Sequence, residues 1–126
     1  MAPPEVMRRF IAAVRAGDRD AAFALFADDV VGHVPGRSPM AGERRGREAV
    51  MEYLQAAIGR AEELDVEVLD ALVGEDHVAL LLHERLWRPD RTLDMRRCNV
   101  YRVRGEEIAE VWIFESDQYA VDEFMP

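Results

Sequence analysis

Residues 92–115 have the sequence TLDMRRCNVYRVRGEEIAEVWIFE, and this stretch predicts two long β-strands. Apolar residues, many of them β-branched or aromatic, recur at short intervals through Thr92–Arg104 and again through Glu107–Glu115. Gly105-Glu106 between them has the composition of a tight hairpin turn. The two strands are therefore expected to pair antiparallel within a sheet.

The residues before this hairpin extend the predicted sheet. Leu64, Val66 and Val68 alternate with acidic residues, which is the period of a half-buried strand. Another apolar strand is predicted at His77–Arg88, after a turn at Gly74-Glu75-Asp76. The C-terminal half is therefore expected to be a run of strands joined by short turns.

The N-terminal half predicts three helices. Apolar residues follow a helical period from Pro4 to Ala16, and Gly17 is a typical C-terminal cap. Asp18 is a typical N-cap for a second helix, which is expected to stop at Asp28-Asp29. The third helix is predicted at Arg47–Ile58.

A short strand and two loops are predicted between the second and third helices. Val30–Val34 has strand composition, whereas residues 35–39 and 41–46 contain the proline, glycine and charged residues typical of loops. Helices in the first half and strands in the second indicate an α+β fold with three helices against one curved sheet. Such an arrangement leaves a deep pocket between the two layers.

Length and composition indicate one domain spanning residues 1–126. The 126 residues are 49% hydrophobic and 33% charged, and no apolar run approaches the roughly 20 residues that cross a bilayer. The net charge of −9 disfavours nucleic acid, because phosphates bind basic faces. The N-terminus does not resemble a secretory signal, so a cytoplasmic protein without a membrane or nucleic-acid partner is expected.

Both faces of the last predicted strand are apolar. Alternation would place Ile108, Trp112 and Phe114 on one face. Val111 and Ile113 would lie on the other face. One face must meet the helices, and a large exposed aromatic patch is unusual on a soluble monomer. We therefore expect a homodimer that packs sheet to sheet.

Four segments resemble the SnoaL-like branch of the nuclear transport factor 2 superfamily. They are FADDV at 26–30, GERRGREAV at 42–50, IAEVW at 108–112 and DQY at 117–119. The resemblance covers nearly the whole chain and implies a cone-shaped α+β fold, NTF2-like or cystatin-like, that is usually dimeric. Members include ketosteroid isomerase, polyketide cyclases, limonene epoxide hydrolase and dehydratases, so the fold does not decide the function.

The comparison with ketosteroid isomerases disfavours their mechanism. The resemblance aligns Phe10 with their oxyanion-donor tyrosine, and Val34, with His33 beside it, with their general base. Their late acidic residue aligns with Cys98 or Asn99. Phenylalanine and valine neither donate to an oxyanion nor accept a proton, so steroid isomerase activity is not expected.

Two other members of the superfamily offer parallels. Arg97 and Asn99 resemble an arginine and an aspartate of the epoxide hydrolases, although an amide cannot serve as the base. The polyketide cyclases use an acidic residue near the end of the last strand, and Asp117 or Glu115 is its counterpart. The resemblance therefore implies acid or base chemistry near the end of this strand.

The predicted catalytic residues are Asp117, His33 and Glu115. Asp117 is either a pocket acid or a cap for the segment after the strand. Glu115 either faces the cavity or forms a structural ion pair with Arg97. His33 is a general base if its imidazole faces the pocket, where it would titrate near neutrality.

Six further residues are predicted to line the pocket: Phe10, His83, Arg97, Asn99, Trp112 and Tyr119. His83 lies among leucines and is alternatively a hydrogen-bonded core residue. Trp112 and Tyr119 are alternatively core or dimer-interface aromatics. Glu84 and Arg85 are adjacent in a strand, so only one of them can face inward.

Together these features predict a pocket protein for a small, largely apolar molecule. The first hypothesis is a cofactor-independent acid/base enzyme of the isomerase, cyclase or dehydratase type. The alternatives are a binding protein without catalytic activity and a dimeric adaptor. The spacing of His33, His77 and His83 matches no recognised metal-ligand set, so neither a metal nor a cofactor is expected.

Overall fold

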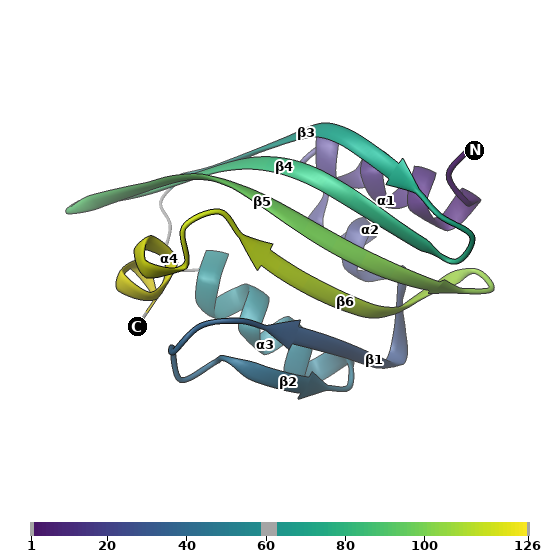
Figure 1. Ribbon diagram of the computed structural model, residues 1–126, viewed down its shortest axis with the longest axis horizontal. Coiled ribbons are helices and arrows are strands. Elements are labelled where there is room, and N and C mark those ends of the chain that lie inside the picture. Colours follow the sequence, from purple (N-terminus) through teal and green to yellow (C-terminus); the bar gives the residue numbers. More distant parts are fainter. Residues whose placement is uncertain (1, 59–62, 126) are drawn as a thin grey trace.

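The computed structural model describes residues 2–58 and 63–125, which form four helices and one six-stranded sheet (Figure 1). The helices are α1 (Glu5–Arg15), α2 (Arg19–Phe23), α3 (Arg47–Ile58) and α4 (Gln118–Phe124). The strands are β1 (Phe26–Val34), β2 (Gly42–Arg45), β3 (Glu63–Val73), β4 (His77–Arg88), β5 (Arg91–Arg104) and β6 (Glu107–Glu115). The predicted α+β architecture is confirmed. None of the helices in the described ranges is long and apolar enough to cross a membrane.

The strands form one curved sheet in the order β2-β1-β6-β5-β4-β3. Strands β3 to β6 make the predicted antiparallel meander, and β1 joins β6 in parallel. Helices α1, α2 and α3 lie behind the sheet in Figure 1, whereas none of the helices in the described ranges covers the face toward the viewer. We call the helix-covered side the inner face and the opposite side the outer face.

Helix α1 forms because its apolar residues share one side. Val6, Met7, Phe10 and Ile11 are all buried against the sheet, and Gly17 with φ of +71° follows the end of the helix. Glycine also sets the approach of α3, because a Cβ at position 32 would lie only 3.2 Å from the Val50 side chain. These helices therefore pack closely enough to enclose the inner face.

Three elements differ from the prediction. Helix α2 ends at Phe23 rather than near Asp28, because Phe26 pairs with Ile108 in parallel register and so begins β1. The predicted loop before α3 contains β2, which pairs antiparallel with β1. The predicted strand order stopped at Glu115, whereas the chain continues into the short helix α4.

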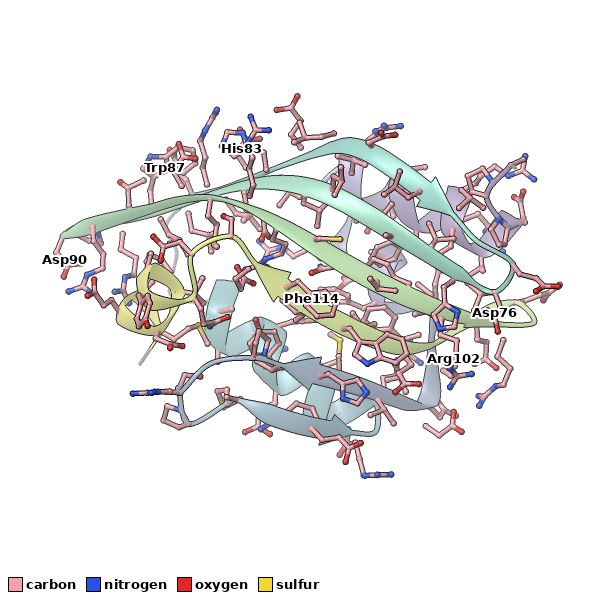
Figure 2. All side chains as sticks on the ribbon, in the orientation of Figure 1. Asp76, His83, Trp87, Asp90, Arg102 and Phe114 are labelled. Atoms are coloured by element: carbon pink, nitrogen blue, oxygen red, sulfur yellow. The ribbon has the colours of Figure 1, made fainter. Side chains whose placement is uncertain are left out.

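A β-bulge corrects the predicted faces of β6. The register with β5 shifts between Arg102, which pairs with Glu110, and Val103, which pairs with Ile108. The alternation therefore reverses, and Ile108 lies in the core rather than on the face of Trp112 and Phe114. Phe114 is exposed on the outer face, where Figure 2 shows it near the middle of the sheet.

Candidate functional site

A cavity of about 260 Å³ lies between the inner face and helices α1, α2 and α3. That volume would hold roughly nine water molecules at ~30 Å³ each, or one small organic molecule. Exposed Gly17, Asp18 and Arg19, at the turn between α1 and α2, border its mouth. Its walls are apolar: Phe10, Ala13, Val14, Ala22, Phe23, Leu54, Leu64, Val66 and Leu82.

Four polar side chains from β4 and β5 form the floor of this cavity. They are Glu84, Arg97, Asn99 and Tyr101. Side chains alternate along a strand, so Arg97, Asn99 and Tyr101 of β5 all face inward. Glu84 shares its inward direction with Leu82 on β4. We call these four residues the polar floor.

Arg97 is held between two carboxylates. Its Nη1 lies 2.5 Å from Glu84 Oε2, and its Nε lies 2.8 Å from Glu115 Oε1. Glu115 is the residue of β6 directly opposite Arg97, and its side chain is only 1% exposed. With all three groups ionised, two carboxylates face one guanidinium, and the cluster has one net negative charge.

Burial changes the proton affinity of several groups here. It raises the pKa of Glu115 above its ordinary value, although Arg97 opposes the shift. Burial alone would lower the pKa of Arg97, but the carboxylates of Glu84 and Glu115 raise it above its usual range. Burial also raises the pKa of Tyr101 to about 12, so its hydroxyl stays protonated at neutral pH.

Asn99, beside this cluster, has a buried acceptor that no donor among the described residues reaches. Asn99 Nδ2 donates to Tyr101 Oη at 3.2 Å, but Asn99 Oδ1 receives no hydrogen bond from residues 2–58 or 63–125. The Glu115 carboxylate, by contrast, is compensated by Arg97, whose Nε lies 2.8 Å from its Oε1. Unpartnered buried acceptors are costly and indicate a place where a ligand or water binds.

The structure places only some of the predicted site residues at the cavity. Phe10, Arg97 and Asn99 line it. Glu115 lies beyond Arg97 and borders a narrow crevice toward α4 instead, and its alternative role, the ion pair with Arg97, is present. Asp117 is exposed and accepts a hydrogen bond from Ala120 N, which is the alternative role of helix cap.

The other predicted site residues lie away from the cavity. His33, His83 and Trp112 lie on the outer face, because their strands direct the neighbouring residues inward. His33 Nε2 contacts Glu110 Oε2 at 2.5 Å, and His83 Nε2 contacts Asp94 Oδ1 at 2.6 Å. Figure 2 shows His83 on the outer side of the sheet. Tyr119, on α4, is 83% exposed.

The site also contains two residues that were not predicted. Glu84 follows the inward alternation of Leu80 and Leu82, which was a usable signal. Tyr101 lies two residues after Asn99 in β5 and therefore on the same face. Among residues 2–58 and 63–125, no three His, Cys, Asp or Glu side chains are grouped to hold a metal ion.

The SnoaL-like domain family model matches residues 7–111. The chain belongs to this family. An uncharacterized protein of Mycobacterium tuberculosis is 30% identical over 122 residues, which are 95% of this chain and 93% of that protein. The structure of Bal32a, from a soil-derived mobile gene cassette, has a TM-score of 0.85 and 29% identity, covering 97% of this chain and 95% of Bal32a.

Other solved SnoaL-like structures support the fold. A putative SnoaL-like polyketide cyclase from Mesorhizobium loti has a TM-score of 0.76 at 23% identity, covering 90% of this chain and 99% of its own. Further similar structures are described as NTF2-like and cystatin-like, so the predicted fold is confirmed. Proteins with this fold often have cyclase or isomerase activity.

Proposed function

We propose that this SnoaL-like protein is a cofactor-independent enzyme that moves a proton on a small, largely apolar molecule bound in the inner cavity. The main support is the Glu84 carboxylate, which is 9% exposed, faces a cavity with apolar walls and contacts Arg97 at 2.5 Å. Buried charges of this kind cost stability, and an apolar ligand does not need them. Their cost is consistent with a catalytic use.

Three residues of the polar floor, and Glu115 behind it, have a role in this proposal. Glu84 accepts a proton from a carbon next to a substrate carbonyl, and the electrons of that C–H bond move toward the carbonyl oxygen. Arg97 and the Tyr101 hydroxyl stabilise the negative charge on this oxygen. When Glu84 returns the proton to another carbon, the product is an isomer; when it passes the proton to a β-hydroxyl whose C–O bond breaks, water leaves and the product is dehydrated. Glu115 is a positioning residue, because it holds Arg97 from the opposite side.

A binding protein without catalytic activity is the second candidate. It is favoured by the pairing of the ionisable groups, since Glu84 and Glu115 both contact Arg97. His33 and His83 are likewise paired with acidic residues. In that function the polar floor would orient a ligand without changing it.

Deuterium incorporation separates the two candidates. The protein is incubated in D₂O with small cyclic ketones and β-hydroxy ketones, and NMR follows exchange at carbon and loss of water. We expect acceleration over buffer by the natural chain and by Ala12→Trp, on the exposed side of α1. Val14→Trp, which fills the cavity from the same helix, should abolish it. Ligands that bind but stay unchanged would contradict the enzyme and support the binding protein.

We also propose that two copies associate through the outer face. Phe114, 55% exposed, lies between two hollows of about 320 and 360 Å³ on this face. Leu69, Leu81 and Cys98 line the first hollow, and a projecting ring beside an apolar hollow can fit its twofold copy. The Glu110 carboxylate on this face is already paired with His33 and Arg102. Burial opposes its ionisation, but the hydrogen bonds of these two residues hold its pKa below the ordinary value.

The variant Phe114→Arg tests this association. Loss of a central aromatic anchor typically costs about 2 kcal/mol or more, so the dimer dissociation constant should rise at least roughly 30-fold. Sedimentation equilibrium measures the constant. Tyr119→Arg, which changes an exposed aromatic of α4 instead, should leave it nearly unchanged. A natural chain that stays monomeric at every accessible concentration would contradict the proposal.

A further inference from the structure

The charge of the cluster of Glu84, Arg97 and Glu115, with all three groups ionised, selects against anions. Two carboxylates, Glu84 and Glu115, already surround the guanidinium of Arg97 at 2.5 and 2.8 Å. An anionic group entering the cavity would meet a cluster with a net negative charge, in surroundings where water screens little. A cationic group would be attracted by the same cluster.

Asn99 favours a ligand that donates a hydrogen bond. The residue is only 9% exposed and borders the cavity, and its Oδ1 has no hydrogen-bond donor within residues 2–58 and 63–125. Its Nδ2 is already engaged with Tyr101 Oη. A ligand that donates a hydrogen bond to Oδ1 would remove the cost of this unpartnered acceptor, whereas a ligand with only acceptors would not.

The walls of the cavity suit an apolar ligand of about one ring that carries a hydroxyl or an ammonium group. The rings of Phe10 and Tyr101 lie 5.0 Å apart between their centroids, and Phe23 borders the same space. Aromatic faces accept aliphatic rings and also attract ammonium groups. A cavity of about 260 Å³ lies just below the lower limit for sites of drug-sized ligands, roughly 300 Å³, so it suits a single ring.

From these observations we infer that the cavity selects small apolar molecules whose polar end donates hydrogen bonds, a hydroxyl or an ammonium group, and rejects anionic ends. The inference rests on the proposed function for the location of the site. It favours hydroxylated substrates, such as β-hydroxy ketones, over simple ketones. It also assigns Asn99 Oδ1 as the atom that accepts the hydrogen bond from the ligand.

Four ligands with the same ring test the inference: cyclohexanol, cyclohexylamine, cyclohexyl methyl ether and cyclohexanecarboxylate. Titrations followed by NMR should show the alcohol or the ammonium binding at least about tenfold more tightly than the ether and the carboxylate. A preference for ammonium would attribute selection to the net charge, and a preference for alcohol to Asn99. An ether or carboxylate that binds as tightly as both donors would overturn the inference, as would failure of both donors to bind.

Substitutions test which residues cause the discrimination against carboxylate and the preference for alcohol over ether. Glu84→Gln removes the net negative charge, so the discrimination against carboxylate should shrink by about tenfold. Asn99→Leu removes the acceptor, and the advantage of alcohol over ether should disappear while the ring still binds. Glu106→Gln, an exposed acid in the turn between β5 and β6, should change neither ratio. These four ligands do not react, so the two proposals fail separately. A selectivity other than the expected one would contradict this inference but not proton transfer, and absence of catalysis would contradict the proposed enzyme but not the selectivity.

Discussion

Replacing Arg97 by methionine should lower the free energy of unfolding by about 3–5 kcal/mol at neutral pH. Methionine fills a similar volume but leaves Glu84 and Glu115 buried without a counter-charge. Both carboxylates contact the guanidinium in the native chain, at 2.5 and 2.8 Å. Urea denaturation followed by circular dichroism measures the loss.

The pH dependence of this variant gives an independent check. Burial already raises the pKa of Glu115 in the folded state, and removing Arg97, which opposes this rise, should raise that pKa further. The folded state then holds protons that the unfolded state releases, so stability falls as pH rises through this range. The Arg97→Met deficit should therefore be smaller near pH ~5 than at pH ~7.

Arg85→Met is the matched control on the outer face. The Arg85 side chain is 41% exposed and pairs with Asp65 and Asp94 in water, so its loss should cost no more than about 1 kcal/mol. The buried cluster would have no special electrostatic role if both variants lost the same free energy of unfolding. The same would follow if the loss in Arg97→Met did not change with pH.

The long periodic elements were the predictable part of this fold. His77–Arg88 and Arg47–Ile58 were predicted with the bounds that the structure has, because 12 residues give each period several repeats. Strand β2 has four residues and helix α4 has seven, too few to establish a period. Their formation depends on pairing with β1 and on packing against β5, which local sequence does not contain.

The candidate site was predictable only where the direction of a strand was known. Arg97 and Asn99 were found through the resemblance, and both lie in β5, whose alternation is regular. His33 was placed in the pocket, but β1 directs Val30 and Val34 inward, and its partners β2 and β6 decide this orientation. Asp117 precedes a helix that was not predicted, so its capping role was recognised only as an alternative.

The second prediction with a large effect concerns Glu84. Glu84→Gln should lower the rate of proton transfer by about 10²- to 10⁴-fold, because an amide of the same shape cannot accept the proton. The fold should remain, since Arg97 keeps Glu115 as a partner and the cluster becomes neutral. NMR exchange rates in D₂O give the activity, and urea denaturation confirms the fold.

Glu115→Gln distinguishes a catalytic carboxylate from a positioning one. Glu115 contacts Arg97 from the side away from the cavity, so its amide should weaken stabilisation of the substrate oxygen without removing the base. We expect a smaller loss of rate than in Glu84→Gln, because the carboxylate that accepts the proton is still present. Equal losses in the two variants would show that Glu115 does more than hold Arg97. If Glu84→Gln stays active while Glu115→Gln does not, Glu84 is not the base, and the proton acceptor lies on the far side of Arg97.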